Sequence, residues 1–169
     1  MLLMSLNLQN LSVLVVEDVK EMRNLFISLL EEMDIGKVYQ APDGERGFEV
    51  FQKFNPDIVF LDWEMPEVSG LALTRQIRRR NDSPNTMAPI IMITGYSSIY
   101  RVSEARDAGI TEFIVKPFSA KDIIKRIETV INKPRDFIIS DNYTGPDRRR
   151  RQVKLYKGPW RREEDNHKQ

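Results

Sequence analysis

Five polar side chains of the sequence stand at or just beyond the ends of short apolar runs. They are, in chain order, Glu17, Asp18, Asp62, Thr94 and Lys116. In an open α/β sheet, the loops beyond the carboxyl ends of the strands form a crevice that holds the functional groups. Taken singly, an acid after a strand is often a helix cap. The whole set, in this order, predicts that three carboxylates, a hydroxyl and an ammonium converge on one edge of a sheet.

The three acidic side chains predict a metal site, because carboxylates brought close repel one another unless a cation lies among them. Ligands that are all oxygen select a hard ion such as Mg²⁺ or Mn²⁺. The same set suits phosphoryl transfer to a carboxylate. Asp62 would be the nucleophile, Lys116 would neutralise charge on the phosphoryl oxygens, and the Thr94 hydroxyl would hydrogen-bond one of them. No general base is needed, because the carboxylate is already ionised.

Short apolar runs alternate with amphipathic segments over most of the chain, at the spacings typical of buried strands and of helices. The predicted strands cover residues 11–16, 37–40, 58–61, 89–94 and 112–115, and the predicted helices cover residues 22–33, 43–54, 70–80, 98–108 and 119–131. Five strand–helix repeats with right-handed crossovers predict an α/β fold of three layers, doubly wound, with a five-stranded parallel sheet. We find no internal repeat beyond this alternation.

The composition is typical of a globular protein, with 41% hydrophobic and 30% charged residues. No apolar run approaches the roughly 20 residues that cross a bilayer, so we expect no membrane role. Residues 1–10 lack a basic region and a small-residue cleavage site, and we interpret them as a leader to the first strand. The sequence has no cysteine, which fits a reducing compartment, and the expected location is the cytoplasm.

The net charge of +1 hides an asymmetry along the chain. Residues 1–132 hold 15 Lys and Arg against 19 Asp and Glu, whereas residues 133–169 hold 11 against 6. The hydrophobic periodicity also fades after Pro134. We therefore predict one domain over residues 11–132, followed by a basic and irregular C-terminal extension, residues 133–169, that is largely extended or disordered.

Arginine and aromatic side chains mark this extension, and those with the strongest claim to an interaction are Arg148, Arg149, Arg150, Arg151 and Trp160. They could bind a partner protein, have no specific role, or bind nucleic acid through phosphate contacts and stacking; we rank nucleic acid last. The extension could also fold back onto its own acidic domain. Because no amphipathic helices follow residue 132, we predict no complete DNA-binding domain.

Motifs at the ends of the predicted strands resemble the signature of response-regulator receiver domains. The resemblance covers about residues 10–132 and rests on Val-Val-Glu17-Asp18, on Asp62-Trp-Glu-Met-Pro66 followed by Gly70, on Ile-Thr94-Gly, and on Phe113-Ile-Val-Lys116-Pro117-Phe118. It implies a flavodoxin-like receiver of the stand-alone, chemotaxis-regulator type, with Asp62 as phosphoacceptor. The implied phosphodonor is a sensor histidine kinase or a histidine phosphotransfer protein. The implied output is a switched protein–protein contact, made by a monomer or a weak phosphorylation-dependent dimer that is not an enzyme.

The resemblance also implies a ligand set for the metal. Asp18, Asp62 and the backbone carbonyl of Glu64 would bind Mg²⁺ directly, and Glu17 would bind it through water. The Lys116–Pro117 peptide bond would be cis. The residues that would shape the surrounding loops are Pro66, Gly70 and Pro117.

A switch follows from the same resemblance, and a control of lifetime is a further hypothesis from the positions of two residues near Asp62 and Thr94. Phosphoryl contact would draw the Thr94 hydroxyl inward, and the ring of Phe113 would rotate into the vacated space and remodel the face of the fourth helix, fifth strand and fifth helix. Many relatives have tyrosine at the position of Phe113, which could also be a simple packed strand residue. Glu64 and Tyr96 would flank the path of water to the acyl phosphate and tune its lifetime.

A second class of function also fits part of the pattern. Some α/β phosphatases and hydrolases use an aspartyl nucleophile with Mg²⁺ and place a general acid/base two residues after it, where this chain has Glu64. The acidic pair after the first predicted strand and the absence of a cap domain weigh against such an aspartyl-nucleophile enzyme.

Overall fold

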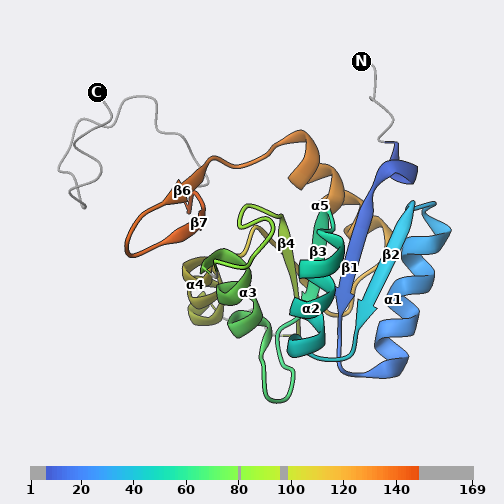
Figure 1. The fold of residues 1–169 in the computed structure, drawn as a ribbon. Helices are drawn as coiled ribbons and strands as arrows, with labels where there is room; N and C mark the ends of the chain where they lie inside the picture. Colours follow the sequence, from blue (N-terminus) through green and yellow to red (C-terminus); the bar gives the residue numbers. More distant parts are fainter. Residues whose placement is uncertain (1–6, 80, 96–98, 149–169) are drawn as a thin grey trace.

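The computed structural model describes residues 7–79, 81–95 and 99–148. Its main feature is a parallel sheet whose strands lie in the order β2-β1-β3-β4-β5 (Figure 1). The strands are β1 (Ser12–Val16), β2 (Lys37–Ala41), β3 (Ile58–Asp62), β4 (Ile90–Thr94) and β5 (Glu112–Val115). The two central runs, β3 and β4, are buried at every residue, which explains why their sequences are almost continuously apolar.

Helices cover both faces of the sheet (Figure 1). They are α1 (Lys20–Glu32), α2 (Gly44–Phe54), α3 (Gly70–Arg79), α4 (Ile99–Ala108) and α5 (Ala120–Asn132), and a short 3₁₀ turn, Leu8–Asn10, precedes β1. Apolar side chains of α1 and α5, including Phe26 and Ile127, pack with Val13 and Phe60 on one face. Helices α2, α3 and α4 cover the other face, so the predicted three-layer, doubly wound fold is confirmed.

Local sequence signals set the ends of two helices. The Asp43 side chain accepts a hydrogen bond from the Arg46 backbone N–H, at 2.8 Å, and so caps the start of α2. The same helix ends where Asn55 takes a left-handed conformation, directly before a proline that cannot continue it. Ser119 and Asp122 form a reciprocal capping box at the start of α5. These caps explain why the predicted helix ends lie within a residue or two of the observed ones.

A two-stranded antiparallel hairpin follows α5 and lies beside α3 and α4 (Figure 1). Its strands are β6 (Phe137–Ile139) and β7 (Thr144–Pro146). The turn is closed by the Ser140 backbone N–H, which donates to the Tyr143 carbonyl at 2.8 Å. The sequence analysis did not predict this hairpin, because each strand has only three residues and β7 carries no apolar run. Within the described residues, no helix is both long and apolar enough to cross a membrane.

Candidate functional site

Asp62 is the last residue of β3, and its carboxylate is held on both oxygens. The Lys116 ammonium donates to one oxygen at 2.7 Å, and the Glu64 backbone N–H donates to the other at 3.0 Å. The residue is only 6% exposed. A buried carboxylate with one cationic and one backbone donor has a fixed orientation, as a nucleophile in phosphoryl transfer requires.

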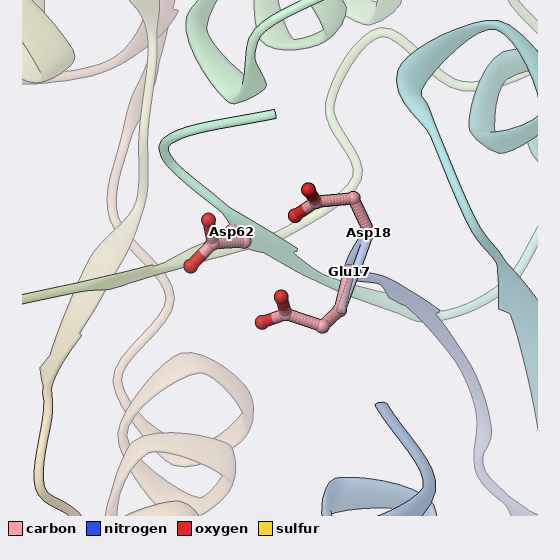
Figure 2. Close-up of side chains that lie close together, drawn as sticks. All are labelled: Glu17, Asp18 and Asp62. Atoms are coloured by element: carbon pink, nitrogen blue, oxygen red, sulfur yellow. The ribbon is translucent and has the colours of Figure 1, made fainter. Parts of the chain in front are cut away.

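Two further carboxylates from the end of β1 join Asp62. Glu17, Asp18 and Asp62 can each offer an oxygen such that all three lie within 4.8 Å of one another. Figure 2 shows the three side chains from β1 and β3 gathered at the same edge. Lys116 also reaches Glu17, at 3.4 Å, and the Val19 backbone N–H donates to the other Glu17 oxygen at 3.2 Å. The structure therefore brings the predicted carboxylates and the predicted lysine together.

Burial dominates the electrostatics of this carboxylate cluster. It raises the pKa of Asp62 above its usual range, and the Asp18 charge raises it further, although the Lys116 hydrogen bond opposes both. Burial also raises the pKa of Glu17, with the Asp62 charge adding to the effect. For Lys116, burial acts to lower the pKa, but the hydrogen bond and charge of Asp62 outweigh it, so the pKa is raised. The Lys116 ammonium therefore offsets only part of the negative charge of the carboxylate cluster.

The donor set fits a hard divalent cation. Every side-chain donor that the cluster offers is a carboxylate oxygen, the ligand type that Mg²⁺ and Mn²⁺ favour. The raised pKa values of Glu17 and Asp62 point the same way, since a cation placed among them would lower both. The described acidic residues could therefore hold a metal ion at this edge of the sheet.

The loop after β3 passes so close to the nucleophile that it requires glycine at its end. A Cβ built on Gly70 would lie 2.2 Å from the Asp62 carbonyl oxygen, a distance that no side chain can adopt. The Gly70 backbone N–H instead donates to the Trp63 carbonyl at 3.1 Å and closes the loop. Pro66 lies exposed within this loop. Gly70 thus fits the close approach of this loop to the Asp62 backbone.

The loop after β5 positions Lys116. Its backbone N–H donates to the Thr94 carbonyl at 2.8 Å, which continues the β4–β5 pairing by one residue. The Lys116–Pro117 peptide bond is cis. Thr94 is buried at the end of β4 and shares the α3–α4 side of the sheet with Met92, because strand side chains alternate between faces. The predicted hydroxyl and ammonium therefore stand on neighbouring strand ends.

Phe113 is 9% exposed and belongs to the apolar cluster on the α2–α4 side of the sheet. This burial accommodates both interpretations, a packed strand residue and a ring that exchanges positions in a switch. Tyr96, the other residue predicted to act near Thr94, lies outside the described residues. So do Arg149, Arg150, Arg151 and Trp160 of the basic extension.

The sequence analysis missed Arg101 in α4, which reaches the rim of the site. Its guanidinium donates to the Glu64 carboxylate at 2.7 Å and lies 5.3 Å from the centre of the Trp63 ring. Arg101 is 37 residues from Glu64 in sequence. No local pattern connects two exposed charges on a loop and a polar helix, so only the folded chain identifies the pair.

A family model described as the response regulator receiver domain matches residues 13–128. The chain belongs to this family. Receiver domains of this kind are signalling proteins, and the arrangement around Asp62 is consistent with a phosphoacceptor role.

Known receivers of similar sequence agree with this assignment. Chemotaxis protein CheY-3 of Vibrio cholerae is 30% identical over 125 residues, which cover 74% of this chain and 95% of that protein. Chemotaxis protein CheY of Pseudomonas aeruginosa is 28% identical over 123 residues, or 73% and 98% of the two chains. Transcriptional regulatory protein PdtaR of Mycobacterium tuberculosis is 33% identical over 124 residues but is covered over only 58% of its length. The matched receiver region thus spans almost the whole of the chemotaxis relatives.

Solved structures show the same fold. The chemotaxis response regulator CheY4 of Vibrio cholerae superposes with a TM-score of 0.66 and 26% sequence identity, covering 72% of this chain and 98% of that one. The hairpin and the rest of the basic extension follow the region that the family model matches.

Proposed function

We propose that Asp62 accepts a phosphoryl group from a sensor histidine kinase or a histidine phosphotransfer protein, and that the modified receiver controls contact with a downstream protein target. The observation that carries the proposal is the Asp62 carboxylate, which is buried, hydrogen-bonded to Lys116 at 2.7 Å and next to the carboxylates of Glu17 and Asp18. Histidine kinases present the phosphoryl group on an imidazole nitrogen, which is a good leaving group.

In this reaction an Asp62 oxygen forms the new P–O bond while the P–N bond of the donor histidine breaks, and the imidazole leaves with the bonding electron pair. Asp62 needs no general base because it reacts as the carboxylate. The Lys116 ammonium is hydrogen-bonded to the Asp62 carboxylate and would neutralise charge on the phosphoryl oxygens. The Thr94 hydroxyl, on the neighbouring strand end, would donate a hydrogen bond to one of these oxygens.

We propose Mg²⁺, or Mn²⁺ in its place, as the metal. Asp18, Asp62 and the Glu64 backbone carbonyl would hold it directly, and Glu17 would hold it through water. When bound, it supplies positive charge that offsets the carboxylates and the phosphoryl oxygens. Glu17 is 3% exposed and shares Lys116 with Asp62, so its role is to orient the cluster rather than to react.

The response would be a shift between two packings of the α4–β5–α5 face. Thr94 and Phe113 lie on adjacent strands and on the same side of the sheet. A movement of the Thr94 hydroxyl would therefore open space into which the Phe113 ring can rotate. Val115, two residues beyond Phe113, is exposed and would be part of the partner surface. Glu64 and Tyr96 would set the lifetime of the acyl phosphate by controlling the approach of water.

We further propose a cytoplasmic protein that is not an enzyme and whose domain spans residues 11–132. The alternative hypothesis, an aspartyl-nucleophile phosphatase, would require Glu64 to serve as general acid/base beside Asp62. In the structure the Glu64 carboxylate is instead paired with Arg101 on α4. This pairing favours the receiver over the phosphatase, because it turns the carboxylate toward the helix.

The test is intact-protein mass after incubation with Mg²⁺ and acetyl phosphate. We expect a single phosphoryl adduct on the wild type and on Asp141→Asn, an exposed acid in the hairpin turn, and no adduct on Asp62→Asn. Lys116→Met should also lose the adduct while the chain stays folded. An unmodified wild type, or an adduct that survives Asp62→Asn, would refute the proposal. Sustained turnover of a phosphomonoester would favour the phosphatase.

A further inference from the structure

A short repeat in the basic extension escaped the sequence analysis. Residues 143–149 read Tyr-Thr-Gly-Pro-Asp-Arg-Arg, and residues 156–162 read Tyr-Lys-Gly-Pro-Trp-Arg-Arg. The two copies are offset by 13 residues and agree at five of seven positions. The structure describes all but the last residue of the first copy, so it shows what this motif does.

The first copy docks on the receiver through its tyrosine. Tyr143 is 6% exposed, and its hydroxyl donates to the Pro146 carbonyl at 2.6 Å, with the Arg106 carbonyl of α4 at 3.3 Å. The Arg148 guanidinium covers the ring, 4.4 Å from its centre, and pairs with Asp107 of α4. The aromatic ring is thus enclosed between the end of α4 and an arginine of its own motif.

The glycine and proline of the motif allow its close approach. A Cβ on Gly145 would lie 2.8 Å from the Gly109 Cα and 2.6 Å from the Tyr143 hydroxyl, so no other residue fits. Pro146 is buried. Arg106 donates to the Arg148 carbonyl at 2.7 Å and completes the contact.

We call the part of the receiver that receives the motif the docking surface, and define it by Arg79, Arg106, Asp107 and Gly109 at the ends of α3 and α4. Arg79 contributes a hydrogen bond to the Asn142 carbonyl at 3.0 Å. The docking surface is distant in sequence from the carboxylates of the phosphoacceptor site, and it is formed by residues outside the strand-end motifs of the family.

The copies agree at five positions, and three of them, Tyr143, Gly145 and Arg148, contact the docking surface in the first copy. Tyr143, Gly145, Pro146 and Arg148 correspond to Tyr156, Gly158, Pro159 and Arg161. The copies differ where the first has Thr144 and Asp147 and the second has Lys157 and Trp160. The chain therefore repeats the tyrosine, glycine, proline and arginine of the docked motif within 20 residues.

We propose that the second copy, residues 156–162, binds the docking surface of a second copy of this chain, in place of that chain's own first copy. Within one chain residues 143–148 fill the docking surface, so the second copy can bind it only where the first copy has left. The seven residues 149–155 reach at most about 25 Å, so the two chains would have to lie close together.

Charge and apolar area favour the second copy as the ligand in trans. Its seven residues carry a net charge of +3, against +1 for the first copy, and residues 1–132 carry −4. Trp160 in place of Asp147 adds a large aromatic surface and removes a negative charge. The first copy has the advantage of being tethered close to its surface, so exchange is expected to rise with protein concentration.

The test uses two full-length forms. The acceptor carries Tyr143→Ala and Tyr156→Ala, so its docking surface is free and it has no intact motif. The donor is the wild type, in which the first copy fills the chain's own docking surface and the second is available. We expect the donor to bind the immobilised acceptor saturably, and Tyr156→Ala in the donor to weaken binding by about tenfold or more, the loss of a buried aromatic anchor.

Two controls decide the outcome. Asp107→Arg in the acceptor removes the partner of the motif arginine and should also weaken binding, whereas Asp62→Asn should leave it unchanged, which separates this interaction from phosphorylation. Thermal unfolding checks that the acceptor is folded. If the acceptor is not folded, a peptide of residues 153–164 is titrated into the wild type. The peptide should displace residues 143–148 from the docking surface and so shift their backbone amide NMR signals. Equal binding by wild type and Tyr156→Ala donors, or no displacement by the peptide, would overturn the proposal.

Discussion

Buried charges at the edge of the sheet around Asp62 and beneath the hairpin differ in how their neighbours compensate them. At the edge, Glu17 and Asp62 compete for the single ammonium of Lys116, and burial raises the pKa of both acids. Beneath the hairpin, Arg78 is 1% exposed and carries its charge into the core without any acidic partner among its described hydrogen bonds.

Backbone carbonyls satisfy Arg78. Its guanidinium donates to the carbonyls of Thr86 and Ala88, each at 2.8 Å, and of Gly109 at 3.0 Å. The ring of Phe137 from β6 covers it, 5.3 Å from the ring centre. Burial lowers the pKa of Arg78 to about 9, so it keeps its proton at neutral pH. The Arg78 charge is thus compensated by groups of the chain itself. Its contacts connect α3 to the loop before β4 and to the hairpin.

The difference separates a structural charge from a functional one. Arg78 forms four hydrogen bonds inside the chain and is almost completely buried. The carboxylate cluster has more negative than positive charge, so it could hold a metal ion. Substitutions at Arg78 should therefore affect mainly stability, and substitutions in the carboxylate cluster mainly ligand binding.

Arg78→Met should lower the free energy of unfolding by about 3 kcal/mol, because it leaves the carbonyls of Thr86, Ala88 and Gly109 buried without their donor. Urea unfolding followed by circular dichroism measures the change. Arg75→Met, on the exposed side of the same helix, is the matched control and should shift stability by less than about 0.5 kcal/mol. Equal effects at the two positions would show that Arg78 is not the anchor we describe.

Mg²⁺ should stabilise the wild type, by about 2.7 kcal/mol at a concentration one hundred times its dissociation constant. Asp18→Asn should remove most of this stabilisation. It should not weaken the metal-free protein, because it takes one charge away from a cluster in which Asp18 raises the pKa of Asp62. Thermal unfolding with Mg²⁺ and with chelator measures both effects. Full retention of Mg²⁺ stabilisation in Asp18→Asn would place the metal elsewhere.

Tyr143→Phe should cost about 1 kcal/mol, the contribution of the hydroxyl that bonds the Pro146 carbonyl near α4. Hydrogen exchange should show faster opening of the hairpin amides, with the central strands unchanged. Tyr39→Phe is the control, since that half-buried ring stacks on Phe54 and should lose little with its hydroxyl. A change that spread evenly over the sheet would contradict a local clamp.

Arg101→Ala should change stability least, by less than about 0.5 kcal/mol, because its ion pair with Glu64 lies at the exposed rim. It should nevertheless alter the decay rate of phosphorylated Asp62, since Glu64 is released beside the path of water. Loss of phosphoryl adduct over time, in wild type and in Arg101→Ala, measures this. Arg46→Ala, which breaks a similar exposed pair with Glu49 far from the site, is the control. Identical decay rates in all three proteins would show that Arg101 does not influence the phosphorylated site.

Much of the fold and the centre of the site were predictable because they depend on short stretches of sequence. Apolar runs of four to six residues, separated by amphipathic helices, specify a parallel sheet, and the carboxyl ends of parallel strands meet at one edge by geometry alone. Asp18, Asp62 and Lys116 were placed together for this reason, before any side chain was seen. Gly70 was identified from a motif, and the contact with the Asp62 carbonyl supplies its physical reason.

The repeat of residues 143–149 and 156–162 was visible in the sequence, but its meaning was not. Only the docked first copy shows that Tyr143, Gly145 and Arg148 contact α4 and the glycine that follows it.

The order of strands and helices, the nucleophile and its cation follow from patterns within each strand and the loop after it, so the amino-acid sequence was sufficient for them. The burial of Arg78, the pairing of Arg101 with Glu64 and the docking of the hairpin bring together residues from different elements, including pairs that are 31, 37, 42 and 63 residues apart along the chain. Such contacts depend on how whole helices pack against one another. The local sequence does not predict them, so only the tertiary structure could show them.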